Sequence, residues 1–286
     1  MELLKSLADW AHACLPPHVA IDLPPTITPI DGDAGFRRYF RLNCQPSLMV
    51  VHAPPEHENV PAFVSKDLAF KAGAVYVPTI YAVDFQRGFM LQEDLGRELL
   101  LPQLTAKSVD RLYGAAEAEL VRIQQVAPDP EVFAPYDQAQ LMREMALFPE
   151  WFVEKLLGIE ISDEERDLIQ QTFHTLVKSA LDQPQVVVHR DYHSRNLMLA
   201  QGENIGVIDF QDALVGAFSY DLVSLLKDCY IRWPADLVRA RAETFLAARI
   251  HALGHQPVSA HQLVTWFDLM GLQRHIKVLG IFARLW

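Results

Sequence analysis

The segment Val186–Leu199, with the sequence VVVHRDYHSRNLML, indicates the fold more clearly than any other part of the chain. Three β-branched residues precede its polar run and an apolar triplet follows, a pattern typical of a buried strand that leads into a loop. A second segment, Gly206–Phe210 (GVIDF), is a short apolar strand that ends in an aspartate. Strands beside both segments would hold Asp191, Asn196 and Asp209 at fixed positions.

Phosphoryl transfer would require these residue types at this spacing. Asp191 could accept the proton of an attacking hydroxyl group, and the amide oxygen of Asn196 could reach a magnesium ion. Asp209 would complete the oxygen-rich site that a hard cation prefers. The alternative is that His189, Asp191 and Asn196 are ordinary loop residues that cap helices, and two motifs in this order weigh against it. His189 is expected to hold the loop rather than to transfer a proton.

Length and composition limit the classes of protein that remain. The chain has 286 residues, half of them hydrophobic, which allows one large domain or two lobes with a sizeable core. A net charge of -11 argues against broad binding to nucleic acid or to an anionic membrane. No apolar run approaches the roughly 20 residues of a membrane span. The three cysteines, Cys14, Cys44 and Cys229, are scattered, so a reducing cytoplasm is expected.

Hydrophobic periodicity changes along the chain. An amphipathic helix through Leu15 is followed by a strand-rich third, and helical periodicity dominates from residue 105 onward. The expected strands are 26–30, 37–42, 47–52, 79–83, 88–92, 186–188 and 204–208. The expected helices are 62–72, 105–125, 136–157, 163–181, 220–229, 234–252 and 260–286. Thr105 and Ser162 are expected helix N-caps, and the join between a β-rich lobe and a helical lobe is expected near residue 94.

These motifs resemble the aminoglycoside phosphotransferase (choline kinase-like) family. The resemblance rests on His189–Asn196, Ile208–Phe210, Gly216 and Tyr220–Leu222, and it covers nearly the whole chain. Protein kinases would carry Asp-Phe-Gly, whereas Phe210 is followed here by Gln211. The resemblance implies a bilobal, protein-kinase-like α+β fold that binds ATP and Mg²⁺. It implies a nucleotide-covering lobe at residues 1–94 and a catalytic, sugar-binding lobe at 95–286.

A narrower resemblance concerns a bacterial subgroup of amino-sugar kinases. It is carried by the segments 36–41, 53–56, 92–96, 190–196, 211–213 and 272–282. The likeness implies phosphorylation of the C1 hydroxyl of N-acetylmuramate and N-acetylglucosamine in cell-wall recycling. Members of the subgroup continue beyond the position of Trp286, so further residues are expected there.

The family likeness also implies nucleotide contacts in the first lobe. The turn at 31–35 and the following strand could cover phosphates through Gly35, Phe36 and Arg37, although an ordinary hairpin is the simpler alternative. His52 stands where kinases carry a phosphate-binding lysine, so Arg37, Arg38 or Arg41 could supply charge instead, or could simply face solvent. The backbone of Glu93 and Leu95 would grip adenine, and a plain exposed linker is the alternative.

The acceptor is expected in front of Asp191, against the helical lobe. The candidate contacts are His193, Arg195, Asp212, Asp228, Arg232, Arg274, His275 and Lys277. An arginine could hold the lactyl carboxylate of N-acetylmuramate. The alternative for Arg274 and Lys277 is a solvated helix face. Asp221 is expected to tie down the catalytic loop, and Asp212 could instead support the metal site.

Two rival functions stay open from the sequence. One is a kinase of the same family with another acceptor, such as an aminoglycoside or a choline-like molecule, although the basic residues at 274 and 275 disfavour a cationic acceptor. The other is a catalytically weak ATP-binding module, which the missing lysine favours and the intact Asp191, Asn196 and Asp209 oppose. The expected partners are a small amino sugar and ATP, without nucleic acid or membrane. The sequence does not indicate an oligomeric state.

Overall fold

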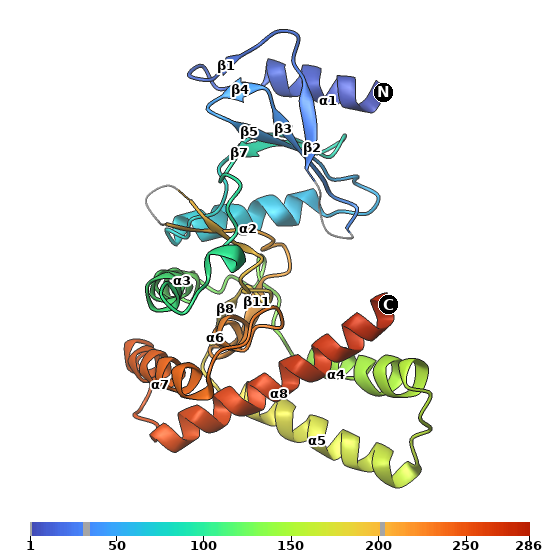
Figure 1. The fold of residues 1–286 in the computed structure, drawn as a ribbon. Helices are drawn as coiled ribbons and strands as arrows, with labels where there is room; N and C mark the ends of the chain where they lie inside the picture. Colours follow the sequence, from blue (N-terminus) through green and yellow to red (C-terminus); the bar gives the residue numbers. More distant parts are fainter. Residues whose placement is uncertain (1, 31–34, 201–203) are drawn as a thin grey trace. The chain divides into compact units, whose positions relative to one another are not determined.

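The computed structural model describes residues 2–30, 35–200 and 204–286 and divides the chain into two compact units (Figure 1). The first unit comprises Met1–Glu98 and Met198–Gln211, and the second comprises Leu99–Leu197 and Asp212–Trp286. The expected lobes, 1–94 and 95–286, remain a prediction. The turn expected at 31–34 lies outside the described residues. No helix among those described combines the length and apolar character that a bilayer span requires.

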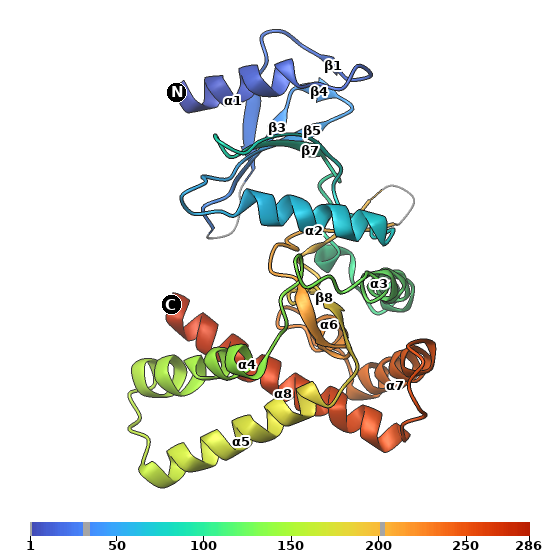
Figure 2. The same ribbon diagram turned by 180° about the vertical axis from the view of Figure 1, so that it is seen from behind.

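The first unit is built on an antiparallel five-stranded sheet with the strand order β2-β3-β5-β7-β6. Its strands are β2 (Ile27–Ile30), β3 (Arg38–Leu42), β5 (Leu48–His52), β6 (Ile80–Asp84) and β7 (Phe89–Glu93). Helices α1 (Glu2–Ala13) and α2 (Val60–Ala72) lie on opposite sides of the sheet (Figures 1 and 2). Alternating strand residues build a core with the apolar face of α1, including Leu7, Phe40, Val50 and Leu91.

Two short strand pairs complete this unit. β1 (Ala20–Ile21) pairs with β4 (Cys44–Gln45), and β9 (Leu197–Leu199) pairs with β10 (Ile205–Val207). The backbone N–H of Val207 donates to the carbonyl of Tyr76, which joins β10 to the segment after α2. β9 begins with the last residue of the second unit, so the polypeptide changes units at this strand.

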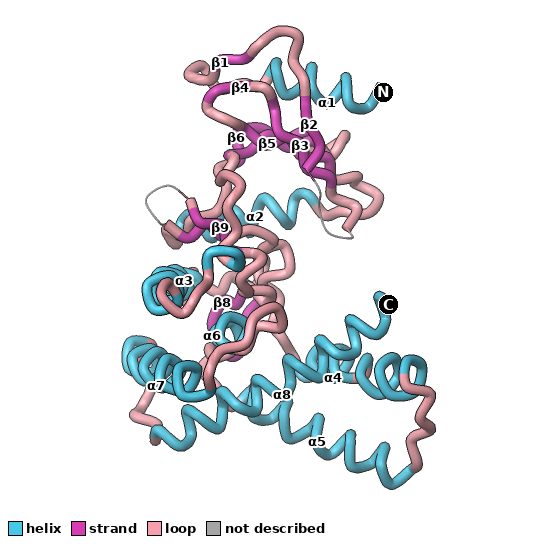
Figure 3. Tube along the Cα trace, viewed as in Figure 1, coloured by secondary structure: helices cyan, strands magenta, loops and turns pink. Residues whose placement is uncertain are grey.

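The second unit is mainly helical (Figure 3). Its helices are η1 (Leu101–Gln103), α3 (Val109–Ile123), α4 (Gln138–Met145), the π-helical η2 (Phe148–Leu156), α5 (Asp163–Leu181), α6 (Tyr220–Leu226), α7 (Ala235–Ala252) and α8 (Ala260–Leu285). β8 (Gln185–Val188) and β11 (Leu214–Ala217) form an antiparallel pair. The long α8 contacts α4, η2, α5, α6 and α7 and so organises the helical packing.

Local capping explains where several helices begin. Ser162 caps α5 in a reciprocal capping box with Glu165, as expected from the sequence. The expectation for Thr105 is wrong, because α3 begins at Val109. The Thr105 hydroxyl bonds instead to the Ser108 hydroxyl over 2.9 Å, and the carbonyl of Thr105 accepts from the N–H groups of Ser108 and Val109. One hydrogen-bonded turn thus precedes the helix.

Candidate active site

Asp221 anchors the start of the polar loop that follows β8. Its carboxylate accepts the backbone N–H groups of His189 over 2.6 Å and of Arg190 over 3.0 Å. Arg190 adopts a φ of +78°, a left-handed conformation that is costly for a residue with a side chain. Burial raises the pKa of Asp221 to about 6, while His189 and the two N–H groups act in the opposite direction. The expected role of Asp221 in holding the loop agrees with these bonds.

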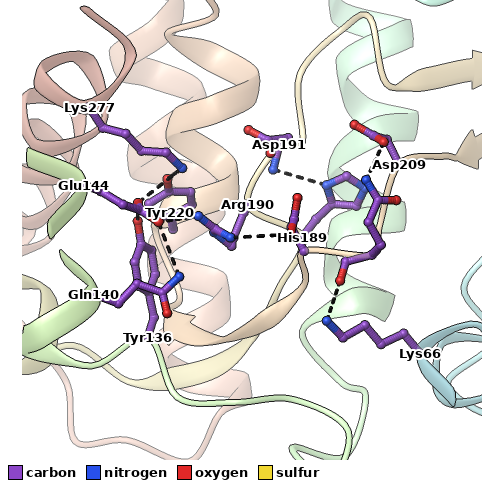
Figure 4. A network of polar contacts seen from close by, with 12 residues as sticks. Lys66, Tyr136, Gln140, Glu144, His189, Arg190, Asp191, Asp209, Tyr220 and Lys277 are labelled. Atoms are coloured by element: carbon purple, nitrogen blue, oxygen red, sulfur yellow. Dashed lines mark hydrogen bonds and ion pairs between the residues drawn. The ribbon is translucent and has the colours of Figure 1, made fainter. Parts of the chain in front are cut away.

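The loop brings Asp191 and Asn196 together. The Asn196 amide nitrogen donates to the Asp191 carbonyl over 3.0 Å, and the Asn196 N–H donates to the His193 carbonyl. The Asp191 N–H points to Nδ1 of His189 at 3.2 Å, which gives His189 the supporting role expected of it (Figure 4). These bonds use the amide nitrogen of Asn196 within the loop, so its oxygen is the atom suited to a cation.

A buried ionic network lies behind the loop (Figure 4). Glu144 of α4 forms an ion pair with Arg190 and lies 3.3 Å from Nζ of Lys277 on α8. Lys277 also donates to the Tyr220 hydroxyl over 3.2 Å, and the Tyr136 hydroxyl bonds to Glu144. Arg274 and Lys277 are both buried, so the alternative of a solvated face is wrong. Their helix is covered by α4 and α6, which a single helix pattern does not reveal.

The charges around Asp191 decide its protonation. Burial alone would raise the pKa of Asp191. The electrostatic effects of Lys277, His189 and Arg190, with that of Lys277 the largest of them, together outweigh burial and hold the pKa below its ordinary value. The carboxylate is therefore ionised at neutral pH. It can orient a hydroxyl group by accepting its hydrogen bond and take the proton as the oxygen gains another bond.

Asp228 fixes the middle of the loop. Its Oδ2 accepts from the Ser194 N–H over 3.0 Å and from the Ser194 hydroxyl over 2.5 Å, and its Oδ1 accepts from the N–H of Tyr230. The Tyr230 ring lies edge-on to His193 and beneath the Arg195 guanidinium at 4.9 Å. Acceptor binding by Asp228, His193 and Arg195 stays a prediction, and the observed contacts of Asp228 hold the loop.

A cavity of about 490 Å³ opens beside this segment. Among the residues that line it are Lys227, Asp228, Arg232, Trp233, Asp268 and His275. His275 is within 3.1 Å of the Lys227 carbonyl, and Lys227 forms an ion pair with Asp268. The cavity therefore combines an aromatic wall with cationic and hydrogen-bonding groups, a composition suited to a polar small molecule.

Like His193 and Arg195, the candidate acceptor residues Arg274 and Asp212 lie outside that lining. Arg274 is buried, and among the described residues its NH1 atom has no hydrogen-bond partner. Asp212 is largely exposed, and its carboxylate lies 4.0 Å from NH1 of Arg190. Acceptor roles for both residues stay predictions. A buried guanidinium nitrogen without a protein partner is costly, and this is the observation that keeps an acceptor role for Arg274 as a prediction.

Asp209 belongs to the first unit and follows β10. It has a φ of +65°, and its Oδ1 accepts from the Gln211 amide over 2.7 Å. Phe210 stacks against Phe63 at 4.7 Å and anchors this segment to α2. Among residues 2–30, 35–200 and 204–286, no cluster of three or more His, Cys, Asp or Glu residues could hold a metal alone. A carboxylate and an amide oxygen suit a divalent cation that also binds phosphate oxygens and water.

The residues of the first unit that are expected to contact the nucleotide range from exposed to buried and have different partners. Gly35 and Phe36 form a bend before β3, and the exposed Phe36 ring stacks on His57 at 4.1 Å. His52 packs edge-on against Phe89, and burial and Arg38 lower its pKa, so it is uncharged at neutral pH. Arg37 forms an ion pair with Glu58 over 2.6 Å. The roles of Gly35, Phe36, Arg37 and His52 as nucleotide contacts stay predictions.

The linker after β7 is held by side chains. Arg41 pairs with both carboxylate oxygens of Asp94, over 2.5 and 3.0 Å, and Ser47 donates to the same group. The exposed-face alternative is therefore wrong for Arg41. Glu93 accepts from the Tyr76 hydroxyl and the Thr79 N–H, so its side chain is engaged. Adenine contacts by the Glu93 carbonyl and the Leu95 N–H stay a prediction.

Sequence reasoning missed Glu144 and the contacts of Gln211. Glu144 lies in an unremarkable helical stretch, far in sequence from Arg190 and Lys277, so only the tertiary structure reveals it. Gln211 is visible in the sequence as the residue that replaces the glycine of Asp-Phe-Gly and as the first residue of the segment 211–213. Its contacts with Arg37 and Asp209 carry no sequence signal, because Arg37 is 174 positions away.

A β-sheet unit, a helical unit and a His-Arg-Asp loop with its asparagine define a kinase-like phosphotransferase. The sequence profile of the phosphotransferase enzyme family matches residues 26–261. The chain belongs to this family and is an ATP-dependent kinase of small molecules.

Named relatives show the same relationship. The chain is 40% identical to the N-acetylmuramate/N-acetylglucosamine kinase of Pseudomonas aeruginosa, over 98% of this chain and 84% of the relative. It is 41% identical to the protein of the same name from Neisseria meningitidis serogroup B, over 89% of this chain and 77% of the relative. Among solved structures, an amicoumacin kinase in complex with AMP-PNP, Ca²⁺ and Ami has a TM-score of 0.62, with 16% identity over 93% of this chain and 83% of that protein. At that identity the likeness concerns the fold.

Proposed function

We propose that this chain phosphorylates the C1 hydroxyl of N-acetylmuramate and N-acetylglucosamine, with ATP and Mg²⁺. The carrying observation is 40% identity, along 98% of this chain, to a kinase named for these two sugars. The cavity lined by Arg232, Trp233 and His275 supports a polar small-molecule acceptor. The chain is expected to act in the cytoplasm.

Asp191 acts on the acceptor in this proposal. Its ionised carboxylate accepts the hydrogen bond of the C1 hydroxyl, orients the oxygen and takes its proton. Asn196 and Asp209 would hold the magnesium ion, which neutralises phosphate charge when bound. Most of the rate enhancement comes from positioning, because the loose transition state asks for little covalent help. An anomeric hydroxyl is more acidic than an ordinary alcohol, so a carboxylate base suffices.

A panel of sugars with Mg-ATP tests the acceptor. We expect ADP release with both amino sugars, a C1 phosphate by NMR and an acid-labile product. Sugars with a 1-deoxy or 1-O-methyl group should be inert, because they lack the hydroxyl that faces Asp191. Phosphate on C6, or turnover only with aminoglycosides or choline, would overturn the proposal.

Arg274 is the proposed reader of the lactyl carboxylate. Arg274→Ala should lower kcat/KM for N-acetylmuramate more than for N-acetylglucosamine, by about 1–3 kcal/mol in relative terms. Arg284→Ala, at an exposed position of the same helix, is the matched control and should leave the ratio unchanged. Equal losses for both sugars would remove Arg274 from this role without affecting the kinase assignment.

A further inference from the structure

A chain of side-chain hydrogen bonds runs from the bend before β3 to Asp209, entirely within the first unit. Glu58 accepts from NH2 of Arg37 over 2.6 Å, and NH1 of Arg37 donates to Oε1 of Gln211 over 2.9 Å. Nε2 of Gln211 then donates to Oδ1 of Asp209 over 2.7 Å. The Arg37 guanidinium and the Gln211 amide thus connect segments from residues 37, 58 and 209–211.

The chemistry of these groups fixes which of them donates and which accepts along this series of hydrogen bonds. A guanidinium group only donates hydrogen bonds and a carboxylate only accepts them. The group between Arg37 and Asp209 must therefore accept on one side and donate on the other, which a glutamine amide does. Arg37 selects the amide orientation, because the opposite orientation would place two donors together and aim the Gln211 oxygen at the Asp209 carboxylate.

The Arg37 side chain is held in place within this series of hydrogen bonds. Its side chain is 9% exposed, its guanidinium lies 4.7 Å from the centre of the Phe63 ring, and Glu58 balances its charge. A rigid, buried guanidinium is well suited to orient a neighbour.

The segment that Gln211 serves needs such support. Asp209 has a φ of +65°, which is rarely adopted by a residue with a β-carbon and persists only where neighbours enforce it. Lys66 of α2 donates to the Gln211 carbonyl, and Phe210 packs on Phe63 (Figure 4 shows Lys66 and Asp209). These contacts hold the backbone, and the Gln211 side chain holds one oxygen of the carboxylate.

We propose that Gln211, oriented by Arg37, is a positioning residue that aims the Asp209 carboxylate at the divalent metal of the nucleotide complex. The inference rests on the proposed function, in which Asp209 is a metal ligand. One carboxylate oxygen accepts from Gln211, which restricts rotation of the carboxylate and leaves the other oxygen for the metal. The loss of this bond lets the carboxylate turn, and metal affinity falls without any change in the number of ligands.

Metal binding tests the inference independently of turnover. Mn²⁺ affinity of the AMP-PNP complex is measured by electron paramagnetic resonance for the wild type, Gln211→Met, Arg37→Met, the double variant and Asp209→Asn. Gln211→Met preserves length and should weaken Mn²⁺ binding about 10-fold, while AMP-PNP affinity in EDTA stays unchanged. The double variant should bind Mn²⁺ no more weakly than the single variant with the larger loss of affinity, because the two residues act in series. Arg87→Met removes an arginine that pairs with Asp84 in the same unit and should have no effect.

The possible failures are distinguishable. Wild-type Mn²⁺ affinity in Asp209→Asn would overturn the metal assignment and this inference with it. A loss in Asp209→Asn together with wild-type affinity in Gln211→Met would overturn the inference alone. Additive losses in the double variant, with AMP-PNP affinity in EDTA unchanged in Arg37→Met, would also overturn it, because they would mean that Arg37 does not act through Gln211. If Arg37→Met does not fold, Arg37→Lys replaces it, since lysine keeps the charge beside Glu58 but lacks the fork that reaches Gln211.

Discussion

Asp191 is held ionised by its neighbours, chiefly Lys277, against the effect of its burial. We expect Asp191→Asn to lower kcat by about 10²-fold or more, because the amide cannot take the acceptor proton. Mg-ATP affinity, measured by calorimetry, should stay close to that of the wild type, since Asn196 and Asp209 are retained. A folded variant with near wild-type turnover would remove Asp191 from the role of base.

Asp67 is a buried carboxylate on the inner face of α2. It is 1% exposed, Lys71 lies 3.7 Å away, and burial raises its pKa to about 6. Between pH 4 and 6 the folded chain binds more protons at this site than the unfolded chain, so this group makes stability fall as pH rises. Asp67→Asn removes that dependence.

Urea unfolding of the wild type and of Asp67→Asn at pH 5 and pH 7.5 measures the contribution of Asp67 to the pH dependence of stability. Relative to the variant, the wild type should lose about 1 kcal/mol of unfolding free energy between the two values. Asp9→Asn is the control, because Asp9 is exposed on α1 and pairs with Lys5. A difference between wild type and Asp67→Asn that does not change with pH would show that Asp67 titrates normally.

At the scale of elements, α8 depends on one glycine where it crosses the α4–η2 junction. A β-carbon on Gly280 would lie 2.5 Å from the carbonyl carbon of Leu147 and 2.7 Å from the nitrogen of Phe148. Because these are backbone atoms, the helices would have to separate. Gly280→Ala should therefore lower the free energy of unfolding by about 1–3 kcal/mol, despite the better helix propensity of alanine.

Gly114→Ala in α3 is the matched substitution. Its β-carbon would meet only NH2 of Arg241, at 3.8 Å, so propensity should dominate and stability should stay equal or rise by about 0.5–1 kcal/mol. Denaturant unfolding of both variants gives the comparison. Equal stability of Gly280→Ala and the wild type would mean that α8 does not pack tightly on this junction.

The sequence predicts elements well where periodicity is strong. The sequence predicts β3, β5 and β7 within one residue of their observed ends, because short runs rich in β-branched and aromatic residues are bounded there by turn-forming residues. The expected helix 136–157 is wrong as one element, since α4 ends at Met145 and a π-helical turn begins at Phe148. β11 was not expected, because its strand character depends on pairing with β8.

The candidate site was predictable only where a motif carries the chemistry. Asp191, Asn196 and Asp209 follow from local spacing, whereas Glu144 and Gln211 gain their importance from partners distant in sequence. Arg274 illustrates the limit, since its position on a helix does not tell whether neighbouring elements bury it. Burial is a property of the packed molecule, and a single helix pattern contains no information about it.

At the scale of the whole molecule, the first unit is made from two separate stretches of chain. Residues 198–211 supply β10 and Phe210, whose ring also lies edge-on to Phe70 at 5.5 Å. A ribosome releases the chain in order, so residues 1–98 emerge long before the segment that completes their unit. The surface of α2 around Phe63 and Phe70 therefore stays uncovered while residues 99–197 are synthesised. Nascent chains halted before residue 198 should bind the chaperones that recognise exposed aromatic surface, and chains extended past residue 211 should release them.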